Sequence, residues 1–174
     1  GNDKLHKWTS LASLTDLELV SELKHPSMNW RLQAQRLLIE RKTGRTGEVL
    51  LPLLALLDDE SVDEIGLNAG AVHALHTLDG LGCMYLDPQH KSSSVVAPCL
   101  IKALSHPSSA VRRNAIAVLP HDEYGLSALL AADNVFSDND AQVRLQGILC
   151  LADMEPSDEA GQLAATLARR NNQD

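Results

Sequence analysis

A nine-residue pattern that occurs four times constrains the fold of this chain more than any other feature. Each copy opens with a large apolar residue, has a small residue four places later and ends with a leucine four places after that. Offsets of four and eight lie on one face of an α-helix, and a small residue in mid-face lets a neighbouring helix approach closely. The copies run from Trp30 to Leu38, Leu67 to Leu75, Val111 to Leu119 and Val143 to Leu151.

The spacing of the copies predicts the architecture. They lie 37, 44 and 32 residues apart, which is typical of stacked helical hairpins in an α-solenoid. Aromatic residues make up only 3% of the chain, and its richness in leucine and alanine favours packing of helix on helix. We therefore predict an all-α fold, a right-handed superhelix of about nine helices in four to five hairpins, that forms one domain over residues 1–174.

Capping residues and helix breakers predict where the helices begin and end. A capping box at Thr15 and Glu18 opens the first helix, and residues 83–92 interrupt the period and are expected to form an inter-repeat loop with at most one helical turn. The last helix has no partner after it, so we expect the chain to be a piece of a longer protein. The helices are expected at about 17–24, 27–42, 48–57, 62–81, 93–104, 108–119, 125–132, 141–154 and 157–170.

The net charge, the hydropathy and the cysteines argue against several classes of protein. The net charge of −8 argues against nucleic-acid binding, which needs a basic face to displace counterions. The chain has no apolar run of about 18 residues, so we expect no membrane insertion. The three cysteines are an odd number without C-x-x-C spacing, which indicates buried thiols rather than a disulfide framework or an attached c-type haem.

Stacked repeats place equal offsets side by side, which predicts two ladders of polar side chains. At offset +1 stand the arginines of a predicted structural ladder, which we expect to bind loop carboxylates such as Asp59, Asp138 or Asp140; Asn68 takes this place in the second copy. Further along the helices, other polar side chains form a candidate concave face for a peptide or a partner domain, with mutual hydrogen bonding as the alternative. The ladder comprises Arg31, Arg112 and Arg144, and the concave face Gln33, Arg36, His73, Asn114 and Gln146.

No catalytic constellation accompanies the repeats. His73, His76 and Asp79 follow one another at intervals of three, but the spacing is not that of a His-Glu-x-x-His zinc helix and no further ligand is set by the sequence. No serine, cysteine or lysine has a recognisable activating base near it in sequence. We therefore predict a chain that is not an enzyme and has no catalytic, metal or cofactor-binding residue.

The paired helices resemble HEAT repeats. In these repeats the first helix is often bent by proline, as Pro52 and Pro98 suggest here, and the second begins with an apolar residue and arginine after a short capped turn. Three longer sequence segments are similar to the HEAT segment of large exported bacterial proteins. In those proteins a sorbosone-dehydrogenase-like β-propeller precedes the segment and a cytochrome c domain often follows. The segments are residues 23–41, 72–82 and 142–154.

This resemblance implies a function and a location. It implies a non-catalytic scaffold that links a redox-type propeller to a cytochrome domain. The full-length protein would be an exported, dehydrogenase-like enzyme of the periplasm or cell envelope. Without either flank in the chain, no catalytic residue of that family is carried over. The alternative is a stand-alone cytoplasmic adaptor that binds a peptide in its groove. A HEAT-like lyase or DNA glycosylase is a third class, and the acidic charge disfavours the glycosylase.

Overall fold

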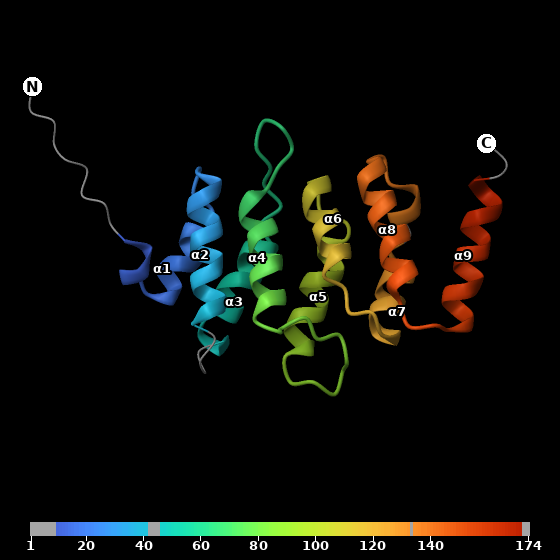
Figure 1. The fold of residues 1–174 in the computed structure, drawn as a ribbon, viewed down its shortest axis with the longest axis horizontal. Coiled ribbons are helices and arrows are strands. Elements are labelled where there is room, and N and C mark those ends of the chain that lie inside the picture. The colour runs from blue at the N-terminus through green and yellow to red at the C-terminus, as the bar shows by residue number, and fades with distance from the viewer. Residues whose placement is uncertain (1–9, 42–45, 133, 172–174) are drawn as a thin grey trace, which may run out of the picture.

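The computed structural model describes residues 10–41, 46–132 and 134–171, and over these ranges the fold is all-α, as predicted (Figure 1). These ranges contain nine α-helices and two short 3-10 turns, and no strand. The helices are α1 (Asp16–Glu22), α2 (Met28–Glu40), α3 (Thr46–Leu57), α4 (Ala69–Gly80), α5 (Ser93–Ala103), α6 (Ser109–Ala117), α7 (Glu123–Ala131), α8 (Ala141–Asp153) and α9 (Asp158–Asn171), and the 3-10 turns are η1 (Leu11–Ser13) and η2 (Val135–Ser137).

The helices form hairpins that stack side by side. Helices α2, α4, α6 and α8 make a row in which each contacts the next, and we call this the helix-B row. Helices α1, α3, α5 and α7 lie behind that row (Figure 1). The turns that lead into the helix-B row lie along one edge of the molecule, at the top of Figure 1. No helix within the described ranges is long and apolar enough to cross a membrane.

The repeated pattern builds the core. Ala34, Ala71 and Ala115, the small residues in mid-pattern, have no exposed surface, and Gly147 takes their place in α8. A Cβ atom on Gly147 would lie 2.5 Å from Cγ1 of the buried Val135, so only glycine leaves room for η2 there. The closing leucines of all four copies are buried in one apolar cluster that extends from Leu11 to Met154.

The connection between α3 and α4 is longer than the sequence suggested, which corrects the expected start of that helix. The carboxylate of Asp63 accepts hydrogen bonds from the backbone N–H groups of Ile65 and Leu67, and Gly66 adopts a left-handed φ of 79°. This local chemistry competes with helix formation. Helix α4 therefore begins at Ala69, with the Asn68 side chain as its N-cap.

The loop between α4 and α5 lies at the opposite edge of the molecule, at the bottom of Figure 1. Residues 83–92 form a loop of turns without a helical turn, in which the rings of Tyr85 and His90 stack with centroids 3.5 Å apart. Helix α9 is the last described helix, and among its described side chains the half-buried Ala160, Leu163 and Leu167 pack against the core cluster.

Candidate interaction surface and the turn network

The four turns before the helix-B row share one hydrogen-bond arrangement. In each, a histidine or aspartate at the first position uses its own side chain to accept the backbone N–H two residues later. This closes the turn locally, as Asx-type turns do. The pairs are His25 with Ser27 at 3.0 Å, Asp59 with Ser61 at 3.1 Å, His106 with Ser108 at 3.0 Å and Asp138 with Asp140 at 2.9 Å.

The residues of the predicted arginine ladder bind these same turns. Each donates to the backbone carbonyl of the first turn residue, and Asn68 does so in the second copy. The donors and distances are Arg31 at 2.7 Å, Asn68 at 2.7 Å, Arg112 at 2.8 Å and Arg144 at 2.6 Å. We expected loop carboxylates as partners of all three arginines. Within the described ranges, however, only Arg112 of the three binds a carboxylate, that of Asp138.

Further bonds join neighbouring turns. The ring Nε2 of His106 lies 3.0 Å from the carbonyl oxygen of Asp59, and Lys24 Nζ lies 3.2 Å from the Asp59 carboxylate. Hydrogen bonds from Ser61, followed by that from Lys24, lower the pKa of Asp59 to about 2. The Arg112 guanidinium likewise lowers the pKa of Asp138. The turns therefore form a continuous polar network along one edge of the solenoid.

A second set of polar bonds joins the helix-B row, and it corresponds to the mutual hydrogen bonding that was the alternative for the predicted concave face. Nδ1 of His73 lies 2.7 Å from Oε1 of Gln35, which connects α4 to α2. Nε2 of His76 lies 2.7 Å from Oδ1 of Asn114, which connects α4 to α6. The other end of the Asn114 amide donates to the Ala110 carbonyl. The signal in the sequence was the alternation of histidine and amide residues on adjacent helices, but their pairing depends on the distance between the helices.

His73 therefore corrects the predicted concave face, where it was expected to be exposed. Its exposed fraction is 8%, and burial, followed by the charge of Arg31, lowers its pKa to about 4. Helices α2 and α4 are in contact, and the bond to Gln35 of α2 places His73 at the interface between them. Asn114 is half-buried and shares this structural role.

The other three residues of the predicted face are Gln33, Arg36 and Gln146. Gln33 and Arg36 are exposed on α2 and, with Trp30 and Leu37, line a cavity of about 390 Å³. Among the described residues, the Arg36 guanidinium pairs with Glu40 on the same helix, at 3.5 Å. Gln146 is half-buried on α8. Of the five residues of the predicted face, the two that are exposed, Gln33 and Arg36, therefore both lie on α2.

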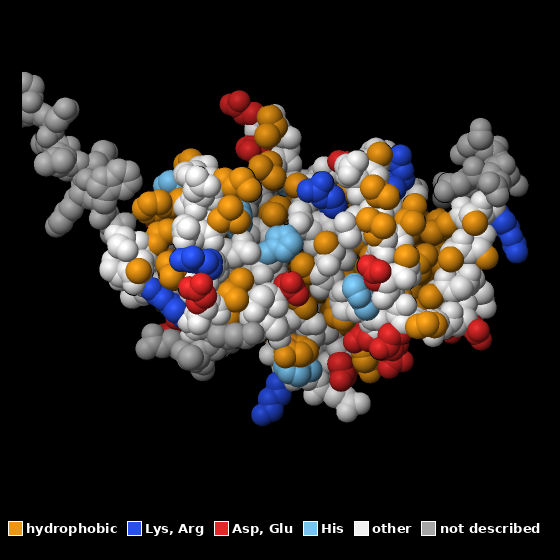
Figure 2. All heavy atoms as spheres, in the orientation of Figure 1, with side chains coloured by type: hydrophobic (Ala, Val, Ile, Leu, Met, Phe, Trp, Pro, Cys, Tyr) orange, Lys and Arg blue, Asp and Glu red, His pale blue; other side chains and the backbone are white. Residues whose placement is uncertain are grey.

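Helix α8 carries an uncovered apolar stripe. Leu145, Ile148 and Leu149 are 47%, 43% and 49% exposed, and their spacing puts them on one helix face. In the space-filling view, apolar side chains gather over α8 and toward α9 (Figure 2). Large apolar side chains that cluster on one exposed face are typical of a surface that contacts another protein.

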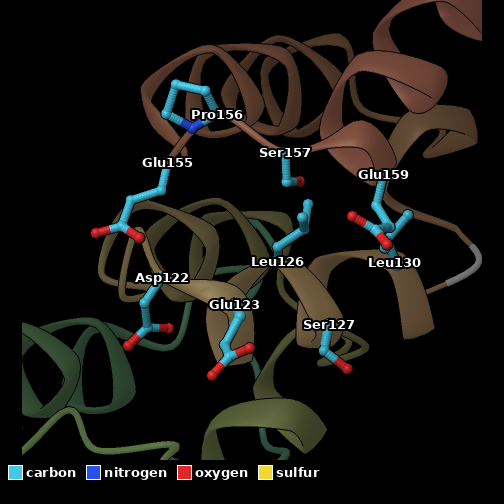
Figure 3. Close-up of a pocket in the computed structure, with 9 residues that line it drawn as sticks. All are labelled: Asp122, Glu123, Leu126, Ser127, Leu130, Glu155, Pro156, Ser157 and Glu159. Carbon is cyan, nitrogen blue, oxygen red and sulfur yellow. The ribbon is translucent and has the colours of Figure 1, made fainter.

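An acidic cavity of about 400 Å³ lies between α7 and the start of α9 (Figure 3). The carboxylates around it belong to Asp122, Glu123, Glu155 and Glu159, and Leu126 contributes to its wall. Asp122 already caps α7 by accepting the N–H groups of Tyr124 and Gly125. Figure 2 shows acidic side chains gathered in this region, below α8.

The side chains best suited to catalysis or metal binding, such as His73, His76 and Cys150, make structural contacts or are buried. His73 and His76 bond to helices on opposite sides of α4, so they do not converge on one point. Among the described residues, no group of three or more histidine, cysteine, aspartate or glutamate side chains is placed to hold a metal ion. Burial raises the pKa of the Cys150 thiol to about 11, which disfavours the nucleophilic thiolate at neutral pH.

The chain was compared with known protein families and with curated proteins. No family and no curated protein matches it.

Proposed function

We propose that this chain is a non-catalytic scaffold of HEAT type that holds neighbouring domains by protein–protein contact. One observation carries the proposal. The histidines and the buried ion pair of the helix-B row serve bonds within and between repeats, whereas the side chains left exposed on its end helices are mostly apolar or amide. Such side chains supply contact area and hydrogen bonds rather than acid–base or nucleophilic chemistry.

The proposed contact surface has two parts. The first is the α8 stripe, Leu145, Ile148 and Leu149, which offers exposed apolar area. The second is the α2 cavity, where Gln33 and Arg36 surround half-buried apolar side chains. A rigid frame is what such a surface needs, and the bonded turns and the α2–α4–α6 bridges supply it.

The resemblance seen in the sequence supplies the setting of the proposal. A propeller on one side and a cytochrome c domain on the other would make the chain a spacer between two redox-active domains of an exported protein. The rival setting is a cytoplasmic adaptor that binds peptides. The full reading frame of the gene separates the two: a propeller sequence upstream and a C-x-x-C-H motif downstream support the first.

The direct test is docking of a separately expressed neighbouring domain to the chain. We expect Leu145→Glu combined with Leu149→Glu to weaken docking strongly, because each change places a charge in apolar contact area. Ile101→Glu is the matched control, since Ile101 on α5 is 46% exposed, close to the 47% of Leu145. Arg36→Ala is expected to weaken docking at the α2 cavity.

The melting temperature of each variant shows whether the fold is intact. The proposal fails if the α8 and α2 variants both dock as well as the unmodified protein does. It also fails if Ile101→Glu weakens docking as much as the α8 double variant does.

A further inference from the structure

The turns before α2 and α6 are nearly identical, and they hold their arginines in the same way. Nη1 of Arg31 donates to the carbonyls of His25 and Pro26 at 2.7 and 2.9 Å. Nη1 of Arg112 donates to the carbonyls of His106 and Pro107 at 2.8 and 3.0 Å. Both guanidinium groups are thereby fixed to their turns through the same nitrogen, which leaves the edge formed by Nε and Nη2 for another partner.

In the described part of the chain, only Arg112 of these two arginines binds a carboxylate through its Nε–Nη2 edge. Nε and Nη2 of Arg112 donate to the two oxygens of Asp138, at 2.7 and 2.8 Å. Nε of Arg31 is buried and has no hydrogen-bond partner in the described part of the chain. Among the described residues the only other such buried side-chain atom is Oγ of Ser108. A buried donor without a partner is costly, so the Arg31 Nε–H calls for an explanation.

The reason for the difference lies in the next turn. Asp59 holds the position equivalent to Asp138, since both are the first residue of their turn. Its Oδ1 accepts the N–H of Ser61, and its Oδ2 bonds Lys24 Nζ. In the later turn the residue equivalent to Lys24 is Ser105, which has no cationic head. Lys24 thus takes the carboxylate that the equivalent arginine holds elsewhere.

A cavity of about 490 Å³ lies between Arg31 and the turn of Asp59. Its acids already have partners, because Lys24 neutralises Asp59 and Asp63 accepts two backbone N–H groups. The groups that remain to bind a ligand are mainly donors. They are the guanidinium of Arg31, which lines the cavity and whose buried Nε lacks a partner among the described residues, and the first turn of α4. Ala69 and Gly70 of that turn line the cavity, and the helix dipole favours an anion there.

We propose that this cavity binds a carboxylate group of a polypeptide partner, held by Nε and Nη2 of Arg31 as Asp138 is held by Arg112. The planar guanidinium edge matches the two oxygens of a carboxylate. The ligand is the side chain of an acidic residue or the terminal carboxylate of a chain. The site lies at the turn edge between α2 and α4, apart from the α8 stripe, so it goes beyond the scaffold function proposed above.

The test is NMR titration of the Arg31 Nε–H signal in the intact chain. The probes are acetate, the peptide N-acetyl-Gly-Asp-Gly-amide and N-acetyl-Gly-Gly-Gly with a free terminal carboxylate, and N-acetyl-Gly-Asn-Gly-amide is the neutral control. We expect a saturable shift with a Kd in the millimolar range for at least one of the peptide carboxylates, and none with the asparagine peptide. Comparison of the two acidic peptides identifies which source of carboxylate fits.

Two further readouts make the assignment specific. Arg31→Lys keeps the charge but loses the two-point edge, so we expect binding at least about tenfold weaker, while Arg36→Lys on the same helix leaves it unchanged. A bound carboxylate also offsets the Arg31 charge that lowers the pKa of His73, so the His73 pKa should rise on saturation.

The proposal is overturned if neither acidic peptide gives a saturable shift, which would mean that water alone fills the cavity. Equal binding of the asparagine peptide, or full binding by Arg31→Lys, would also overturn it. Saturation by acetate without either peptide would show an adventitious anion only. None of these results depends on the docking of a neighbouring domain, so the two proposals fail independently.

Discussion

Arg112 and Asp138 form a two-point ion pair that ties α6 to the turn before α8. The distances are 2.7 Å from Nε to Oδ2 and 2.8 Å from Nη2 to Oδ1, and the two side chains are only 14% and 3% exposed. Nη1 of the same arginine binds the turn before its own helix. One side chain therefore connects two successive repeats, and this is the strongest polar link of the turn network.

Loss of the Arg112 bonds should lower the free energy of unfolding more than loss of the equivalent Arg31 bonds in the first repeat. Arg112→Ala leaves the buried Asp138 carboxylate without its partner, so we expect the free energy of unfolding to fall by about 3 kcal/mol. Arg31→Ala removes the same bonds to a turn but no carboxylate pair, so its loss should be clearly smaller. Urea denaturation of both variants measures the difference, and equal losses would contradict the assigned role of Asp138.

The two glycines Gly147 and Gly161 should respond in opposite directions to alanine. A Cβ at Gly147 meets Cγ1 of Val135 at 2.5 Å and Cε1 of Phe136 at 3.2 Å, whereas a Cβ at Gly161 meets nothing within 4 Å. We expect Gly147→Ala to destabilise the protein by about 1–2 kcal/mol, since overpacking outweighs the gain in helix propensity. Gly161→Ala should raise stability by up to about 1 kcal/mol. A stabilising Gly147→Ala would show that η2 can move away from α8.

The small residue in mid-pattern should resist enlargement, while a neighbour on the same helix should accept it. Ala115 has no exposed surface, and Ala117, two residues later on α6, is exposed. We expect Ala115→Leu to cost roughly 1–3 kcal/mol through overpacking between helices. Ala117→Leu should leave the melting temperature nearly unchanged. Similar melts for the two variants would mean that Ala115 is not at a close helix contact.

His73 should make the protein less stable as the solution becomes acidic. Its pKa is about 4 in the folded chain, below the ordinary value of 6.5, so between these values the unfolded state binds the proton more readily. Stability from the neutral ring is full above pH 6.5 and falls by up to about 3 kcal/mol as the pH approaches 4. His73→Gln, which cannot titrate, should show a shallower decline in urea denaturation between pH 7 and pH 5. Identical pH profiles for the two proteins would contradict the buried, neutral state of His73.

The sequence by itself determined the helices and their contact faces. The apolar, small and leucine positions recur at offsets of four and eight, and helix geometry alone puts those positions on one face. The burial of Ala34, Ala71 and Ala115 follows from that period. Most turns could also be predicted, because proline and capping residues act over only a few residues of chain. The exception is the connection between α3 and α4, where hydrogen bonds to the Asp63 carboxylate delay the start of the helix to Ala69.

Only the tertiary structure decided which polar groups are partners. Lys24 and Arg31 both lie near the turn of Asp59, and distance in space, not spacing in sequence, gives the carboxylate to Lys24. His73 has the same offset as the exposed Arg36, yet it is buried against Gln35. Helix periodicity sets the direction of a side chain, whereas its burial and its partner depend on how closely the next helix packs. Such pairings join residues 26 to 38 positions apart, beyond the reach of any local pattern.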